Sequence, residues 1–252
     1  MNDDEARLVN GRLFVPFQWV KNYLGYQGDW SAATKRLNIM PSQENGISLT
    51  SVTSNKTSSE AEINLKYPQV SHLGNTEAET AINEILKQDA LKFNESIEKY
   101  IQERNTVQEI SLQSPYEFMS SYVVTYNQNN VLSLITEHYE YTGGAHGMTY
   151  RKGFTFSLKD GKLLSLGDLF GKNESYEKQL NDKIKAKFNA TPGYFGGFEQ
   201  LRDDPDFYLQ QGTLKVFFQV YEYTPYVAGF PELFFSFDTL LPKGSSPFDS
   251  LK

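Results

Sequence analysis

The residues that could do chemistry gather around a glycine-rich motif, Gly143-Gly-Ala-His-Gly147, which holds one of only three histidines in the chain. An imidazole at this place could face a ligand, since neutral histidine is a common metal ligand and proton carrier. It could equally hydrogen-bond to nearby backbone where the glycines let strands approach closely. We favour the structural interpretation of His146 and keep this residue as a candidate for ligand binding.

A metal site is the next possibility, with His138, Glu137, Glu140 and His146 as its conceivable ligands. In a strand, Glu137 would point to the face opposite His138 and Glu140. The sequence also has no His-x3-His pair at helical spacing. We therefore expect no metal site and no cofactor.

Motifs for nucleophilic or nucleotide chemistry are missing from the sequence. Gly143-Gly144 lacks the pattern of a dinucleotide or phosphate loop, and no G-x-S-x-G segment occurs. The acidic pair Asp203-Asp204 precedes a proline in a polar turn, where we expect it to be solvated. Two glycosidase carboxylates far apart in the chain would leave no local signal, but none is indicated. The sequence predicts that the protein is not an enzyme.

A second group of residues could form a binding surface. Tyrosines cluster beside proline and glycine in the segment 221–231, and exposed tyrosine offers rigid amphipathic area for an interface. A buried layer beneath a helix explains the same pattern equally well. The candidate ligand-binding residues are Tyr141, His146, Tyr221, Tyr223, Tyr226 and Phe230.

Composition narrows the class of protein. The 252 residues carry a formal net charge of −7, which argues against nucleic-acid binding because phosphates need a basic patch. The chain has no cysteine, so disulfides and zinc–thiolate sites are excluded. No apolar run approaches the ~20 residues that span a bilayer, and we expect any signal or anchor to lie outside the given chain.

The elements that must position these residues begin with a small unit at 1–40. Asn10-Gly11 between two apolar pairs predicts a β-hairpin, Pro16 opens a short helix, and two short strands follow. A polar linker is expected at 41–46.

Two larger α+β units are expected, at 47–141 and 142–252, each an antiparallel sheet packed by a helix. The first contains a long helix at 76–103, which opens with the capping box Thr76-x-x-Glu79 and has apolar residues every three or four positions. The second contains the Gly143–Gly147 motif, a helix at 173–190 and a strand at 214–220 that pairs with 233–237.

These two units resemble the tandem extracytoplasmic domains of the RsiV-type anti-sigma factors and of the PdaC-type peptidoglycan deacetylases. The first 40 residues resemble a truncated copper amine oxidase N-terminal repeat, which implies a stalk-like module rather than copper chemistry. The matching segments are Asn10–Pro16, Ile63–Val70, Ala81–Asn83, Gly143–Gly147, Asp160–Lys162, Leu166–Phe170, Phe218–Glu222 and Pro225–Pro231.

The resemblance implies a location outside the cytoplasmic membrane, extracellular or at the cell surface of a Gram-positive bacterium. We interpret the chain as a non-catalytic binding or sensing module of the cell envelope. Its expected partner is a basic protein such as lysozyme, or cell-wall material, with no nucleic acid and no membrane span in this chain. The alternatives are a structural or accessory spacer domain of a wall-associated protein and a hydrolase that acts on peptidoglycan.

Overall fold

The computed structural model describes residues 7–15, 26–41, 44–106, 115–170, 175–241 and 247–248. The predicted helix after Pro16 lies outside these residues.

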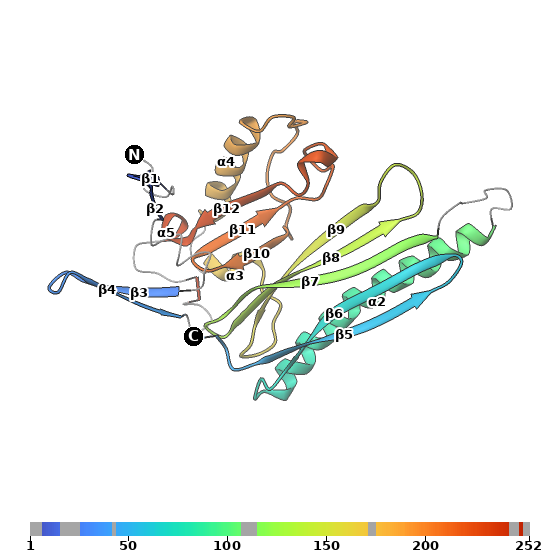
Figure 1. Ribbon diagram of the computed structural model, residues 1–252, viewed down its shortest axis with the longest axis horizontal. Helices are drawn as coiled ribbons and strands as arrows, with labels where there is room; N and C mark the ends of the chain where they lie inside the picture. The colour runs from blue at the N-terminus through green and yellow to red at the C-terminus, as the bar shows by residue number, and fades with distance from the viewer. Residues whose placement is uncertain are drawn as a thin grey trace.

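The fold is α+β, as the sequence predicted (Figure 1). The strands are β1 (Arg7–Val9), β2 (Arg12–Phe14), β3 (Tyr26–Ser31), β4 (Arg36–Pro41), β5 (Ser48–Thr57), β6 (Ala61–Ser71), β7 (Tyr116–Gln128), β8 (Val131–Tyr141), β9 (Met148–Ser157), β10 (Phe207–Gln210), β11 (Thr213–Phe217) and β12 (Glu232–Ser236). The helices are α2 (Thr76–Thr106), α3 (Leu166–Phe170), α4 (Tyr176–Asn189) and α5 (Phe237–Leu240), with a 3-10 turn η1 (Tyr226–Ala228).

The main sheet has five strands in the order β5-β6-β7-β8-β9. We expected it to be antiparallel, but β6 and β7 run parallel. The reason is α2, which carries the chain back along the sheet so that β7 starts at the same end as β6. The other neighbouring pairs in this sheet are antiparallel.

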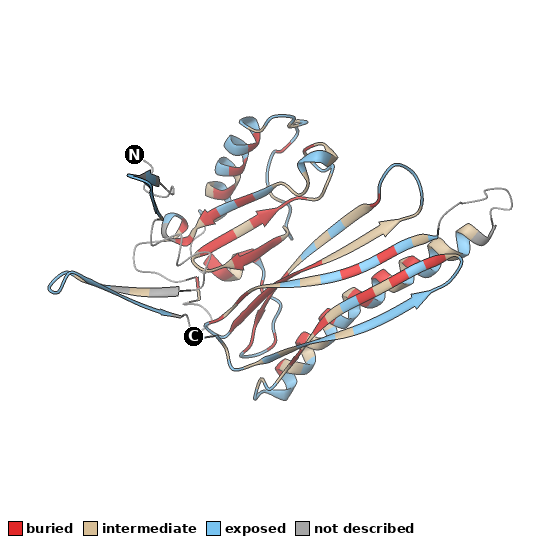
Figure 2. Cartoon of the chain, in the orientation of Figure 1, coloured by how far each residue is buried: buried red, intermediate tan, exposed pale blue. Residues whose placement is uncertain are grey.

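Helix α2 has 31 residues and is therefore about 46 Å long. It lies along one face of the main sheet (Figure 1). Its apolar stripe is buried against the strands (Figure 2) and consists of Ala78, Ile82, Leu86, Ala90, Phe93 and Ile97. The periodicity therefore predicted this helix correctly, although the helix ends three residues later than expected.

The N-terminus of α2 is capped differently from the prediction. The side-chain oxygen of Asn75 accepts hydrogen bonds from the backbone N–H groups of Glu77 and Ala78, at 3.1 and 3.2 Å. The Glu79 carboxylate accepts one from the N–H of Leu73, at 3.1 Å. Asn75, rather than Thr76, is therefore the capping residue.

A largely buried polar contact joins α2 to β8 of the main sheet. His138 Nε2 lies 2.9 Å from Asp89 Oδ2, and the side chains are only 12% and 13% exposed. The hydroxyl of Thr136 donates to the same carboxylate oxygen at 3.0 Å. Burial by itself raises the pKa of Asp89, but the hydrogen bond and charge of His138 outweigh it, with Thr136 and Lys152 assisting, and the pKa is lowered overall.

The second sheet has the order β10-β11-β12 and is antiparallel. One of its faces packs on α4 through Leu180, Ile184 and Phe188 of that helix. Its other face contacts the main sheet, where Tyr208 and Phe217 pack on Ile135 of β8. The layers are therefore helix, five-stranded sheet, three-stranded sheet and helix.

The two sheets meet without space between their backbones. A Cβ placed on Gly153 of β9 would lie 1.9 Å from the carbonyl oxygen of Phe207 in β10. Next to this crossing, the Leu209 N–H donates to the hydroxyl of Ser133 at 3.0 Å, and Ser133 is bonded to Thr155 at 2.8 Å. Glycine at 153 is therefore required by the approach of β10.

The second sheet covers only half of the main sheet. In β8, residues 131–136 are buried on both sides, whereas residues 137–141 are only partly buried (Figure 2). We placed a boundary between units after Tyr141, but β9 pairs with β8 along ten positions, Glu140 to Val131. The Gly143–Gly147 motif therefore joins two strands of one sheet.

The second sheet also differs from the expectation in its strands. We expected a strand at 214–220, but β11 ends at Phe217, and Gln219–Tyr223 forms a turn in which Tyr221 has φ +68°. Strand β10 was not predicted, because four residues are too few for alternation to be recognised.

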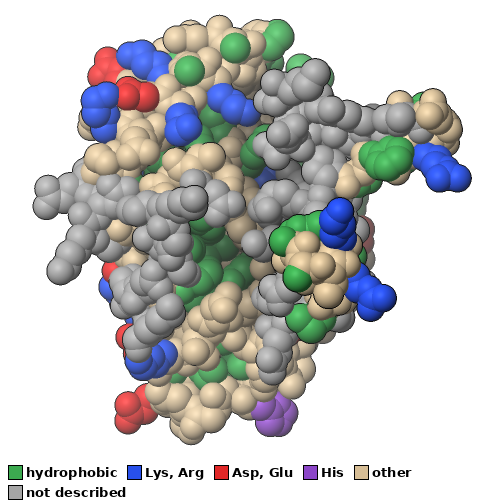
Figure 3. Space-filling view, turned by 90° about the vertical axis from the view of Figure 1, so that its left-hand side faces the viewer, with side chains coloured by type: hydrophobic (Ala, Val, Ile, Leu, Met, Phe, Trp, Pro, Cys, Tyr) green, Lys and Arg blue, Asp and Glu red, His purple; other side chains and the backbone are tan. Residues whose placement is uncertain are grey.

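The N-terminal residues form two separate two-stranded ribbons, β1–β2 and β3–β4. The β3–β4 hairpin projects from the rest of the molecule (Figure 1), and hydrophobic side chains are visible at this end (Figure 3). Exposed large hydrophobic residues of the ribbons are Leu8, Leu13, Phe14, Trp30, Leu37, Ile39 and Met40. None of the described helices is long and apolar enough to cross a membrane.

The sheet crossing predicts a large effect for Gly153→Ala. The added methyl group would overlap backbone of β10 rather than a flexible side chain, so the sheets must separate locally, at a cost of about 3 kcal/mol. Urea denaturation measures this change. Gly46→Ala is the control, because a Cβ there has no neighbour within 4 Å; equal stability of the two variants would contradict the tight crossing.

The Asp89–His138 contact predicts a pH-dependent contribution. Because the pKa of Asp89 is lowered in the folded state, its stabilisation is present above about pH 4 and is lost as the pH falls through the folded-state pKa. We expect Asp89→Asn to lower the unfolding free energy by about 2 kcal/mol at pH 7 and by progressively less under acid conditions. Asp182→Asn, which removes an exposed ion pair to Lys178, should cost under about 0.5 kcal/mol at every pH. If the difference in unfolding free energy between Asp89→Asn and the unmodified chain became larger as the pH falls, the assignment would be contradicted.

Candidate functional site

The uncovered half of the main sheet forms an open groove of about 590 Å³. It lies on the face opposite α2 and crosses all five strands. Its lining residues are Thr53, Asn55, Asn64, Leu65, Lys66, Met119, Ser120, Ser121, Glu137, Tyr139 and Thr149. We call this feature the sheet groove.

Most of the lining side chains are polar, and in β6 and β7 they alternate with buried residues, since Leu65 lies between Asn64 and Lys66 and Ser120 between Met119 and Ser121. Asn55 and Asn64 lie opposite each other on β5 and β6, and Thr149 lies opposite Tyr139 on β9 and β8. Among the described residues, the side chains of Asn55, Ser121 and Thr149 have no hydrogen-bond partner. Their amide and hydroxyl groups are therefore available to a ligand.

Two larger side chains give the sheet groove an apolar component. Met119 is 44% exposed, and the ring of Tyr139 lies across the strand pair from it in the β7–β8 register. Burial and the neighbouring charge of Glu117 raise the pKa of the Tyr139 hydroxyl. The phenol therefore remains protonated and can donate a hydrogen bond at neutral pH.

Arg151 bounds the sheet groove on the side of the second sheet, because it pairs with the lining residue Glu137 and with Glu232 of β12. Its Nε and Nη2 atoms donate to Glu137 Oε1 at 2.9 and 2.7 Å, and its Nη1 atom bonds to Glu232 of β12. The guanidinium also lies 4.1 Å from the ring centre of Phe230. This arginine neutralises the acid at the edge of the sheet groove and ties it to the second sheet.

The structure brings three of the six predicted ligand-binding residues into contact, and places a fourth, Tyr141, against the same loop. The ring of His146 stacks on Tyr226 with centres 3.9 Å apart, and the Tyr221 hydroxyl lies 3.3 Å from His146 Nε2. Tyr226 donates to the carbonyl of Gly147 at 3.2 Å. Tyr141 closes the loop by donating to the carbonyl of Gly144 at 3.0 Å. We call these residues the aromatic cluster: Tyr141, His146, Tyr221 and Tyr226.

The aromatic cluster borders the sheet groove through Tyr139. A Cβ on Gly147 would lie 2.5 Å from the Tyr139 ring, so that ring rests directly on the glycine beside His146. The two surfaces are therefore adjacent.

The other two predicted residues lie elsewhere. Tyr223 packs among aromatic rings of the second sheet and α4, with Phe188 at 5.1 Å and Phe218 at 5.1 Å between ring centres. Phe230 lies beneath the Arg151 guanidinium. Neither contacts His146.

The residues considered for a metal site are held by different partners. Glu137 bonds to Arg151, His138 to Asp89, and the Glu140 carboxylate accepts from Tyr100 at 3.2 Å. The Nδ1 atom of His146 bonds to the Gly147 carbonyl at 3.0 Å, which is the local backbone contact that the glycines suggested.

Sequence reasoning missed the sheet groove. Ser121, Asn55 and Thr149 occur in alternating strands, where polar residues normally face solvent. Their only local signal is that alternation, which does not tell which strands become neighbours or which part of the face stays uncovered.

Two family models match successive parts of the chain. Residues 54–149 match the model described as "Deacetylase PdaC", and residues 167–238 match the model described as "Protein of unknown function (DUF3298)". The chain thus contains a PdaC domain followed by a DUF3298 domain, which confirms the resemblance of its tandem units to those of the PdaC-type deacetylases. The resemblance of the first 40 residues to the amine oxidase repeat stays a prediction.

A curated relative and two solved structures agree with this assignment. The chain is 22% identical over 107 residues to the peptidoglycan-N-acetylmuramic acid deacetylase PdaC of Bacillus subtilis, and the match covers 42% of this chain and 21% of the relative. The match therefore spans about a fifth of the relative's length. A DUF3298-family structure from Bacteroides fragilis superposes with a TM-score of 0.58 at 20% identity, covering 81% of this chain and 96% of that one. One from Pseudomonas aeruginosa gives 0.56 at 17% identity, covering 78% and 94%. At these identities the two structures show the fold alone.

The match to PdaC corrects the functional interpretation. We interpreted the chain as a non-catalytic binding or sensing module that recognises a lysozyme-like protein, and predicted that it is not an enzyme. The named relative is instead a peptidoglycan deacetylase, which is a hydrolase, and lysozyme binding has no support in these matches. The sequence pattern misled because the prediction rested on missing local motifs. The relation to the cell wall is retained.

The contacts of Arg151 predict that lysine cannot replace it. Lysine keeps the charge but cannot donate to Glu137 and Glu232 from one planar group, so we expect Arg151→Lys to lower the unfolding free energy by about 2 kcal/mol in urea titrations. Arg36→Lys, on an exposed strand of the N-terminal ribbon, is the matched control and should stay within about 0.5 kcal/mol. Indistinguishable midpoints for the two variants would rule out a structural role for this network.

Proposed function

We propose that this chain works in the deacetylation of peptidoglycan, outside the cytoplasmic membrane, and that the sheet groove receives the glycan strand. The proposal rests on where the residues that line the sheet groove lie in the sequence. Every residue that lines the sheet groove except Thr53 lies within the segment 54–149, which matches the deacetylase family. The open polar face of the main sheet is thus built by the segment that matches the deacetylase family.

The reaction is the hydrolysis of an N-acetyl group on a wall sugar. Water adds to the acetamide carbonyl, the C–N bond breaks, acetate leaves and the nitrogen takes up a proton. Before that step the sugar must be held with its acetamide fixed, since orientation supplies a large part of a hydrolase's rate enhancement. We assign this positioning role to the sheet groove.

The chemistry of the sheet groove suits a glycan. Sugar hydroxyls and acetamides both donate and accept hydrogen bonds, as do the side chains of Asn55, Ser121 and Thr149. The exposed thioether of Met119 and the ring of Tyr139 can pack on the apolar face of a sugar ring. Arg151 already neutralises Glu137, so Lys66 is the one lining charge that no ion pair of the described residues balances.

The aromatic cluster extends this surface. Its members lie next to Tyr139, and Tyr221 is 47% exposed. We assign Tyr141, His146, Tyr221 and Tyr226 to contacts with a neighbouring sugar of the same strand, since ring faces bind pyranoses without requiring charge.

The test measures both activity and binding. Purified chain is incubated with peptidoglycan and the released acetate is quantified, while calorimetry follows binding of an N-acetylglucosamine tetramer. Binding together with acetate release supports the proposal. If neither is detected, the chain is a spacer domain of a wall-associated protein and the proposal fails.

A substitution in the sheet groove tests its location. Ser121→Arg places a long side chain among the lining residues, so we expect at least tenfold weaker binding of the N-acetylglucosamine tetramer, equivalent to about 1.4 kcal/mol. Ser54→Arg is the matched control. It lies on the exposed edge strand β5 opposite Leu65, on the other face of the same sheet, and should leave binding unchanged. Equal affinities of the two variants would move the glycan site elsewhere.

A further inference from the structure

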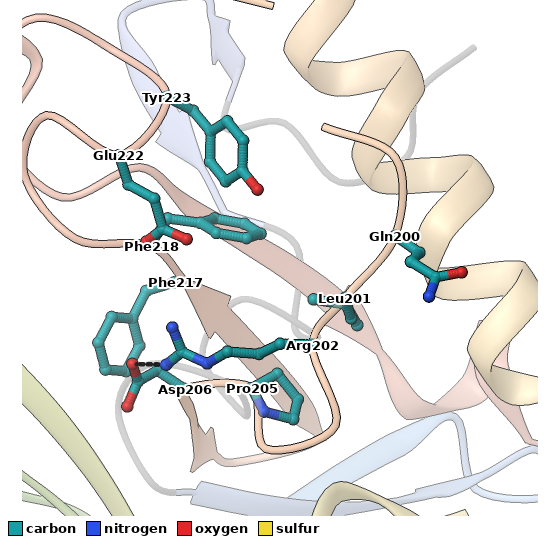
Figure 4. A pocket seen from close by; sticks show the side chains of 9 residues that line it. All are labelled: Gln200, Leu201, Arg202, Pro205, Asp206, Phe217, Phe218, Glu222 and Tyr223. Carbon is teal, nitrogen blue, oxygen red and sulfur yellow. Dashed lines mark hydrogen bonds and ion pairs between the residues drawn. The ribbon is translucent and has the colours of Figure 1, made fainter. Parts of the chain in front are cut away.

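A second concave site lies on the DUF3298 part of the chain (Figure 4). Its volume is about 180 Å³, below the roughly 300–1,000 Å³ of sites for drug-sized ligands, so it holds at most about one sugar ring. Figure 4 shows Tyr223 and Glu222 on one side, Arg202 on the other and Phe218 between them. The full lining is Gln200, Leu201, Arg202, Pro205, Asp206, Phe217, Phe218, Glu222 and Tyr223. We call it the Glu222 pocket.

The Glu222 pocket has one negative charge in excess. Arg202 is matched by Asp206, whose carboxylate it contacts, and its Nε also donates to the Asp204 carbonyl at 2.6 Å. Glu222 accepts a hydrogen bond from the Gln219 N–H at 2.7 Å, and within the described residues no cation pairs with it. A ligand with one positive charge would therefore be favoured.

The remaining groups suit a ring with hydroxyls. Phe217, Phe218 and Tyr223 give the Glu222 pocket aromatic surface. The Tyr223 hydroxyl has no hydrogen-bond partner among the described residues, and burial together with the charge of Glu222 raises its pKa. It therefore stays a phenol that can donate to a ligand.

The Glu222 pocket is linked to the wall of the sheet groove by one side chain. The Gln219 amide nitrogen donates to the Arg151 carbonyl at 2.7 Å and to Asp206 Oδ2 at 3.2 Å. The Gln219 amide oxygen accepts from the Arg151 N–H at 3.1 Å. One residue thus contacts both the strand that carries the groove wall and an acid of the pocket.

We propose that the Glu222 pocket binds a deacetylated amino sugar, a glucosamine-type ring with a free ammonium group, and so recognises the product of the reaction proposed above. This inference rests on the proposed function. Deacetylation replaces a neutral acetamide with an ammonium, and only the ammonium can form a charge-assisted bond to Glu222. The chain then holds acetylated and deacetylated sugars at two connected places on one glycan strand.

The experiment compares two sugars and one peptide by calorimetry, at a pH where amines are protonated. The probes are a glucosamine tetramer, an N-acetylglucosamine tetramer and a lysine-containing pentapeptide, because stem peptides of the wall also carry ammonium groups. We expect Glu222→Gln to weaken binding of the glucosamine tetramer at least about tenfold. Binding of the N-acetylglucosamine tetramer should not change. Glu95→Gln, an exposed glutamate on α2, is the matched control and should alter neither.

Two results would overturn the inference. The first is that the glucosamine tetramer does not bind, or binds with an affinity that Glu222→Gln leaves unchanged. The second is that Glu222→Gln weakens binding of the pentapeptide instead of the glucosamine tetramer. Ser121→Arg separates this failure from that of the proposed function. If Ser121→Arg still weakens the acetylated tetramer while Glu222→Gln has no effect on either sugar, only the product site is lost.

Discussion

The crossing of two sheets at Gly153 is the constraint on which the other features depend. The Phe207 backbone occupies the space of a side chain at that position, so β10 lies directly on β9 and the second sheet covers half of the main one. The same contact buries Ser133 and Ile135, aligns Arg151 with Glu232 and leaves the other half of the sheet open. A looser crossing would give neither the wall of the sheet groove nor the buried half of β8.

The two faces of the main sheet carry different tasks because they have different neighbours. The α2 face is closed by an apolar stripe and by the buried pair of Asp89 and His138, in which one carboxylate oxygen of Asp89 bonds both to His138 Nε2 and to the Thr136 hydroxyl. On the uncovered half of the opposite face, the side chains of Asn55, Ser121 and Thr149 have no hydrogen-bond partner among the described residues. The α2 face and the covered half of the opposite face thus contribute to stability, and the uncovered half is left free to bind.

Sequence patterns identified the regular elements well. Apolar spacing predicted α2 and its buried residues, and the predicted hairpin at Asn10-Gly11 joins β1 and β2, with both turn residues at positive φ. The parallel pairing of β6 with β7 and the short strand β10 were missed. Part of the site was also predicted, since His146 and Tyr226 are in contact. Tyr223 was grouped with them, but the turn at Tyr221 directs it toward the second sheet and α4.

The sequence by itself determined the elements whose signals are local: a helix with apolar residues every three or four positions, turns at residues that tolerate positive φ, and strands that alternate. The tertiary structure decided which polar positions became the sheet groove and the Glu222 pocket. These sites join residues far apart in the chain, such as Asn55 with Thr149, and the side chains on the open face of a sheet resemble those on any solvated strand. Only the packing of one sheet on another determines which of them remain uncovered.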